Sequence, residues 1–210
     1  MKKFILEFII YFSIFLSLLY IRSFIRNNKA FKLFTIYLIV ISIIQLSSFL
    51  IIKSGGESNL FLSHYYFISQ FILLSLFFKE LLKFKWISWV LYIGLLLIGY
   101  QYIIEPNLYF QYNTIGMAIT QTFIVIYSLL YFYKSLSGKN EFILVNIGLF
   151  FYLLSSTLIF ASGNLVFDLS IREQVSRLLN IINAVLYLVF QLLIFVECWR
   201  NHRTILLKSN

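Results

Sequence analysis

Residues 86–104 read WISWVLYIGLLLIGYQYII, a long apolar run without a charged side chain. A helix needs about 20 such residues to cross about 30 Å of hydrocarbon. Within this run, Leu91–Ile98 does not alternate between apolar and polar positions, as a membrane β-strand would. The segment therefore predicts a membrane-spanning α-helix.

The rest of the chain repeats this pattern of apolar windows separated by short polar or charged breaks. Seven spans are predicted, at 4–21, 33–52, 60–78, 86–104, 114–133, 142–167 and 178–199. No break is long enough to form a second domain. We therefore predict an all-α polytopic membrane protein, a seven-transmembrane-helix bundle forming a single transmembrane domain over residues 1–210.

The overall composition agrees with this prediction. Hydrophobic residues make up 61% of the 210 residues and charged residues 12%, whereas a soluble domain carries about 25% charged residues. This excludes a water-soluble globule. One proline and eight glycines exclude a disordered or collagen-like chain. A single cysteine, Cys198, excludes an intramolecular disulfide framework and a cysteine-cluster metal site.

The lysines and arginines are unevenly divided between the two sides of the predicted bundle. One side has Arg22, Arg26, Lys29, Lys32, Lys79, Lys83, Lys85, Lys134, Lys139, Arg200, Arg203 and Lys208, and the other has Lys2, Lys3, Lys53, Arg172 and Arg177. Basic loops are retained in the cytoplasm, so twelve against five predicts an external N-terminus and a cytoplasmic C-terminus. The net charge of +9 then reflects topology and attraction to anionic lipid, and we expect no nucleic-acid binding.

Uncharged polar side chains recur along several of the predicted helices. At 100° per residue, Asn183 and Tyr187 share one face of the last span, and Gln70 follows Ser63 and Tyr66 on the third. At 1.5 Å per residue, Gln45, Gln121 and Asn183 lie roughly 8–10 Å below the outer boundary. Polar groups in hydrocarbon normally face protein or a water-filled cavity. The pattern predicts a polar cavity in the outer half, with six candidate ligand-binding residues: Gln45, Gln70, Gln121, Asn164, Asn183 and Tyr187.

The same amides have a second interpretation, as interhelical hydrogen bonds that only hold the bundle together. Such bonds contribute about 0.6 kcal/mol each on average and occur in most polytopic proteins. The sequence leaves both interpretations open.

The usual catalytic and metal-binding sets are missing from the sequence. His64 and His202 lie at opposite predicted membrane faces, and no pair of carboxylates lies mid-membrane. We therefore expect no enzymatic activity, no metal and no cofactor. A carrier for an uncharged solute stays open, although the predicted helices lack the proline breaks that many carriers use.

One region resembles a family. Its residues are Phe150-Phe151-Tyr152, Ile159-Phe160-Ala161-Ser162-Gly163-Asn164-Leu165-Val166-Phe167, Asn180-Ile181-Ile182-Asn183 and Tyr187. This region, about a fifth of the chain, resembles poorly characterised seven-helix membrane proteins of Bacteroidetes that are often encoded near sensor histidine kinases. The resemblance implies a sensory or accessory role, with a separate histidine kinase or another membrane protein as partner.

Together these patterns predict a sensor-like protein of the bacterial inner membrane that binds a small solute or lipid in the polar cavity. The alternatives are a small-solute carrier and a non-catalytic membrane scaffold or accessory subunit. The lipid bilayer is the one partner that all three share.

Overall fold

The computed structural model describes residues 2–56, 58–138, 141–168 and 173–208; in 2–4, 160–168, 173–177, 180 and 201–208 it describes the backbone alone. The elements are α1 (Lys2–Arg22), α2 (Lys29–Lys53), α3 (Phe61–Leu82), α4 (Trp86–Ile104), η1 (Pro106–Phe110), α5 (Thr114–Ser135), α6 (Ile143–Asp168) and α7 (Glu173–Lys208). Among the described residues, six helices are long and apolar enough to cross a membrane, and the apolar part of α6 that meets the same test is the shorter Ile143–Ile159. The chain is therefore all-helical where it is described, and its apolar helices indicate a membrane protein.

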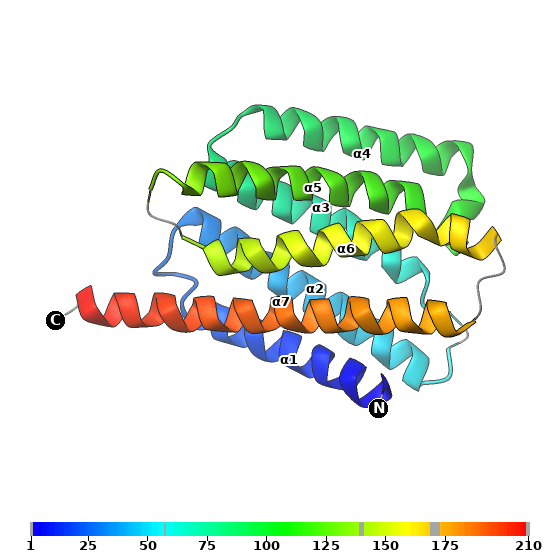
Figure 1. Cartoon of the computed structure of the whole chain (residues 1–210), viewed down its shortest axis with the longest axis horizontal. Coiled ribbons are helices and arrows are strands. Elements are labelled where there is room, and N and C mark those ends of the chain that lie inside the picture. Colours follow the sequence, from blue (N-terminus) through cyan, green and yellow to red (C-terminus); the bar gives the residue numbers. More distant parts are fainter. Residues whose placement is uncertain (1, 57, 139–140, 169–172, 209–210) are drawn as a thin grey trace.

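The last helix differs most from its predicted span. We predicted 178–199 from hydropathy, whereas α7 runs from Glu173 to Lys208 and projects beyond the other helices at the C-terminal end (Figure 1). Hydropathy marks where hydrocarbon ends, while a helix ends where its backbone is capped or broken. No glycine or proline follows Gly163, so the helix continues past its apolar part.

The six helices α1, α2, α3, α5, α6 and α7 form a closed ring in which each packs against the next and α7 returns to α1. Helix α4 lies outside this ring, mainly against α3 (Figure 1). Gly148 permits close packing of α6 on α7, because a Cβ there would lie 2.6 Å from Cδ2 of Phe190. This agrees with the role of small residues at membrane helix interfaces.

The bundle has two ends, which we name by their contents. The "cavity end" is where α1, α3, α5 and α7 begin; the "basic end" is where α2, α4 and α6 begin. Asparagines cap a helix at each: Oδ1 of Asn28 accepts from N–H of Phe31 at the basic end, and Oδ1 of Asn113 accepts from N–H of Gly116 at the cavity end. Such side chains pair amides that have no partner within the helix.

An aromatic plug, consisting of Phe31, Phe34, Phe77 and Phe142, fills the ring toward the basic end. The Phe142 ring lies 5.3 Å from Phe77, 5.9 Å from Phe34 and 6.1 Å from Phe31, centroid to centroid. Phe142 has φ +61°, which is rare for a bulky residue. This backbone conformation directs the ring of the residue before α6 into the core, where it is 2% exposed.

Candidate ligand-binding cavity

A cavity of about 650 Å³ lies at the cavity end, between the first turns of α1 and α3, the last turns of α2 and the third to fifth turns of α7. Its volume is within the range of pockets that hold drug-sized ligands. Its lining residues are Ile5, Leu6, Ile9, Ile10, Ile44, Gln45, Ser48, Phe49, Ile52, Asn59, Leu60, Leu62, Ser63, Tyr66, Tyr112, Tyr152, Ile181, Asn183, Ala184 and Tyr187.

Three of the six predicted ligand-binding residues line this cavity: Gln45, Asn183 and Tyr187. Nε2 of Gln45 donates to the hydroxyl of Tyr187 at 2.9 Å. This bond joins α2 to α7 across the ring, since the two helices are not neighbours in it. Two of the predicted ligand-binding residues are therefore in direct contact.

Two other predicted residues, Gln70 and Gln121, are not among the cavity lining. Gln70 is buried and donates to the Tyr37 hydroxyl at 3.3 Å, and Gln121 is buried and accepts from Oγ1 of Thr157 at 3.2 Å. These two amides form interhelical bonds, α3 to α2 and α5 to α6. Asn164 belongs to the part of α6 whose side chains lie outside the described residues.

Two tyrosines that we did not select as site residues line the cavity beside Tyr187. Tyr152 of α6 has its ring 5.0 Å from that of Tyr187, and Tyr66 comes from α3. The sequence carried a signal for Tyr66, which shares a helix face with Gln70. Tyr152 also packs against α7, since its ring stacks on that of Phe190 at 5.9 Å.

Helix α1 supplies an apolar wall that sequence reasoning also missed, because aliphatic residues on an apolar helix carry no distinguishing pattern. Polar contacts position this wall: Ser42 of α2 is bonded to Ser13 at 2.7 Å and to Ser17 at 2.8 Å. On the other side, Nε2 of Gln191 donates to the carbonyl of Ile9 at 3.1 Å. Helix α1 is thus hydrogen-bonded to both of its neighbours in the ring.

Two amide oxygens at the cavity, Oε1 of Gln45 and Oδ1 of Asn183, are buried and have no hydrogen-bond partner among the described residues. An unsatisfied buried acceptor costs about 1–3 kcal/mol. Both of the buried polar atoms that lack a partner at this cavity are therefore acceptors.

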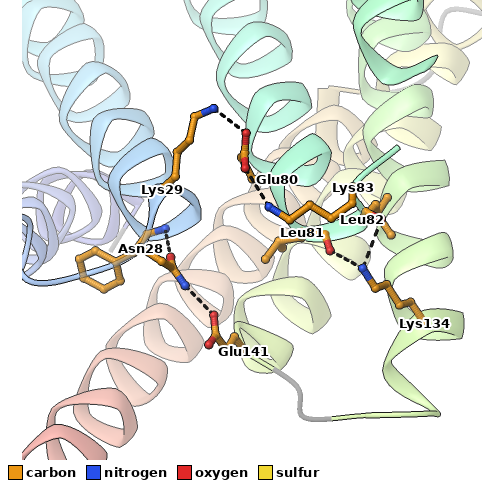
Figure 2. A network of polar contacts seen from close by, with 9 residues as sticks. Asn28, Lys29, Glu80, Leu81, Leu82, Lys83, Lys134 and Glu141 are labelled. Carbon is orange, nitrogen blue, oxygen red and sulfur yellow. Dashed lines mark hydrogen bonds and ion pairs between the residues drawn. The ribbon is translucent and has the colours of Figure 1, made fainter. Parts of the chain in front are cut away.

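The basic end is built differently, from charged side chains (Figure 2). Glu80 of α3 lies between two ammonium groups, Nζ of Lys29 at 2.6 Å and Nζ of Lys83 at 3.0 Å. Nζ of Lys134 donates to the carbonyls of Leu81 and Leu82 at 2.7 and 3.2 Å. A cation at this position stabilises the C-terminus of α3, where carbonyls lack helical partners.

Two carboxylates tie other helix ends into the same face. Nδ2 of Asn28 donates to Oε2 of Glu141 at 2.8 Å, joining the start of α2 to the loop before α6 (Figure 2). Glu197 of α7 is fully buried; its Oε2 accepts from N–H of Leu144 at 3.0 Å and its Oε1 pairs with Arg200 at 3.0 Å. A carboxylate at the first turn of α6 is the favourable partner for that helix end.

At the outer rim of α3, His64 links three elements. Its Nδ1 is 2.5 Å from the Tyr102 hydroxyl of α4, and its Nε2 is 3.1 Å from the carbonyl of Tyr109 in η1. A neutral imidazole satisfies both contacts, accepting at one nitrogen and donating at the other. His64 therefore fastens η1 over the ends of α3 and α4.

Within the described part of the chain, no three histidine, cysteine, aspartate or glutamate side chains gather as a metal site. Comparison with protein-family models, with curated proteins and with solved structures finds no match to this chain. The geometry of the cavity is therefore the basis for the functional proposal.

Proposed function

We propose that the chain is a non-enzymatic, receptor-like protein of the bacterial inner membrane that binds a small solute or a lipid in the cavity and passes its occupancy to a partner. In this proposal the protein has seven spans, an external N-terminus and a cytoplasmic C-terminus. The uneven distribution of lysine and arginine supports this orientation. The cavity then opens toward the outer leaflet.

One observation carries the proposal: amides from α2 and α7 and tyrosines from α3, α6 and α7 converge on a cavity of about 650 Å³. Away from the cavity, Gln70 and Gln121 are hydrogen-bonded to neighbouring helices. Oε1 of Gln45 and Oδ1 of Asn183 have no partner among the described residues, which is also true of Oδ1 of Asn146 and Oε1 of Gln191 away from the cavity. Gln45 and Asn183 differ from those two residues because they line a cavity large enough for a ligand, and this supports the cavity interpretation at this end.

Helix α7 supplies a physical route from the cavity to the basic end. Tyr187 lines the cavity and Glu197 accepts from the backbone of α6, and both belong to one continuous helix. The two residues are ten positions apart, which is about 15 Å along the axis. A shift of α7 caused by a ligand would therefore change the contact between Glu197 and Leu144.

The partner is expected at the basic end, where α7 continues to Lys208. The family resemblance favours a separate histidine kinase as this partner. Another membrane protein would contact the same charged residues at the basic end. In the scaffold alternative the helices would hold that partner without a ligand.

The test compares gently extracted protein with the same protein after delipidation. Native mass spectrometry is expected to show a retained small molecule that the Gln45→Leu/Asn183→Leu variant loses. Hydrogen exchange at the amide of Leu144 is expected to change when that molecule is removed. A partner chain retained by both proteins, with no small molecule in either, would favour the scaffold instead.

A carrier is the second candidate, and one observation favours it. Below the cavity, polar groups continue inward to the Gln70–Tyr37 pair, and the aromatic plug fills the ring beyond. Solute flux in proteoliposomes without any partner, increased by Phe142→Ala, would support this reading.

A further inference from the structure

The walls of the cavity determine which charge and polarity a ligand can have, and its polar residues determine which hydrogen bonds the ligand can make. The walls include isoleucines and leucines of α1 and α2, and among the side chains that the structure describes no acidic or basic one lines the cavity. Burying an unpaired charge in such a site is costly, because no counter-charge offsets its desolvation. The walls therefore favour an uncharged molecule with an apolar body.

The amides of Gln45 and Asn183 determine which hydrogen-bonding groups a ligand needs. Nε2 of Gln45 is already engaged with the Tyr187 hydroxyl, while Oε1 of the same amide is unpaired, as is Oδ1 of Asn183. An amide oxygen can only accept hydrogen bonds. A ketone, an ester or an ether would leave both oxygens unsatisfied, and a carboxylate would also repel them.

We infer that the cavity takes an uncharged amphiphile whose polar end donates at least two hydrogen bonds, as a diol or a primary amide does, to Oε1 of Gln45 and Oδ1 of Asn183. This inference rests on the proposed function and specifies its ligand.

The burial of the two oxygens gives the ligand a means of acting on the bundle. Both atoms are covered by protein, so each amide must turn to meet a donor in the cavity. Turning Gln45 breaks its bond to Tyr187, the contact that joins α2 to α7. Occupancy and the position of α7 are thereby coupled through one side chain, because the ligand competes for Gln45.

The experiment uses a matched pair of probes on the full chain in lipid nanodiscs. The probes are 1,2-dodecanediol and its dimethyl ether, 1,2-dimethoxydodecane, which share a carbon skeleton and differ in donors. Affinities are obtained from the shift of the thermal unfolding midpoint with probe concentration. The diol is expected to bind at least about tenfold more tightly, since two acceptors remain unpaired with the ether.

Variants test which residues cause the preference for the diol over the ether. Gln45→Leu/Asn183→Leu is expected to bring the ratio of the two affinities close to one. Gln121→Leu removes an amide that lies outside the cavity and is expected to keep the ratio of the wild type. Circular dichroism and size-exclusion elution check that each variant is folded, and the comparison of probes on the wild type needs no variant.

The outcomes separate the inference from the function. Equal binding of diol and ether, with a change in exchange at the Leu144 amide on binding, would overturn the inference and leave the receptor proposal standing. If Gln45→Leu/Asn183→Leu still prefers the diol, the inference is also overturned, because residues other than Gln45 and Asn183 would then accept the hydrogen bonds of the diol. If neither probe binds but the protein retains a native small molecule, only this ligand class is rejected. If neither probe binds and no small molecule is retained, the receptor proposal is rejected as well.

Discussion

At the cavity end, Gln45 and Tyr187 are joined by a bond between neutral groups, and two amide oxygens have no partner in the described part of the chain. At the basic end, by contrast, Glu80 is shared by Lys29 and Lys83. The first end surrounds an open volume with neutral polar groups. The second uses charged groups to fix helix ends to one another (Figure 2). The contrast suggests an end that can rearrange around a ligand and an end whose contacts report the rearrangement.

The aromatic plug separates these two regions, so its removal should have the largest effect. Phe34 is fully buried and packs against Tyr20, Tyr37, Phe77 and Phe142. Phe34→Ala is expected to lower the free energy of unfolding by about 3–5 kcal/mol, through lost contacts and the void left behind. Unfolding by sodium dodecyl sulfate in mixed micelles, followed by circular dichroism, measures this.

The matched control is Leu96→Ala on α4, where the side chain is 73% exposed. A surface change of this kind should cost about 0.5 kcal/mol or less. Similar losses for Phe34→Ala and Leu96→Ala would mean that the plug is not a packed partition between the ends.

Glu197 provides the next largest effect, because it is the buried charge of the basic end. Glu197→Ala removes the acceptor for N–H of Leu144 and the partner of Arg200. Hydrogen bonds to charged groups contribute about 1.5–3 kcal/mol, and we expect a loss of unfolding free energy in that range.

Hydrogen exchange gives an independent readout for Glu197→Ala, since the Leu144 amide should exchange faster. Glu105→Ala, at an exposed carboxylate, is the control and should leave exchange at Leu144 unchanged. Unaltered Leu144 exchange in Glu197→Ala would remove the proposed link between α7 and α6.

The two asparagine caps allow the ends to be compared with the same residue type. Asn28 is exposed and Asn113 is buried, where its Nδ2 also donates to Oε1 of Gln101 at 3.1 Å. Replacing a cap by alanine costs about 0.5–2 kcal/mol. We expect Asn28→Ala near the lower limit and Asn113→Ala near the upper, because the latter also leaves Gln101 without this donor.

Detergent unfolding of both variants tests this order, with Asn107→Ala, an exposed asparagine in η1, as the reference. A larger loss in Asn28→Ala than in Asn113→Ala would show that the charged network around Glu141, and not burial, governs cap strength.

Most of the helical architecture followed from hydropathy. The predicted spans from 4–21 to 142–167 each overlap one helix, because twenty apolar residues leave the backbone no hydrogen-bonding partner but itself in hydrocarbon. The ring order, with α4 outside, could not be predicted, since helix faces that contact lipid or protein are equally apolar here. The length of α7 was missed for a related reason: hydropathy locates the membrane boundary and not the helix end.

The site was only partly readable from the sequence. Helical periodicity and depth placed Gln45, Asn183 and Tyr187 together, but the same reasoning selected Gln70 and Gln121, which bond to neighbouring helices instead. Depth along an axis does not reveal the rotation of a helix or its neighbours. That information arises from side-chain packing between helices distant in sequence.

The smallest expected effect on stability is that of Lys29→Met, and its dependence on salt separates the charged basic end from the neutral cavity end. Nζ of Lys29 contacts Glu80 at 2.6 Å, but the lysine side chain is 73% exposed and Glu80 keeps Lys83 when Lys29 is removed. Lys29→Met should therefore lower the free energy of unfolding by about 0.2–1 kcal/mol. The loss should shrink as salt rises, because the screening length falls from about 10 Å at 0.1 M to about 3 Å at 1 M.

Gln45→Leu supplies the opposite case, since its bond to Tyr187 joins neutral groups. Its effect on stability, measured by the same detergent titration at 0.1 M and 1 M salt, should be independent of salt. A salt-dependent change for Gln45→Leu would place charge close to the cavity and undermine its assignment as an uncharged site. A salt-independent loss for Lys29→Met would instead mean that packing of the lysine stem, rather than its ammonium group, stabilises the basic end.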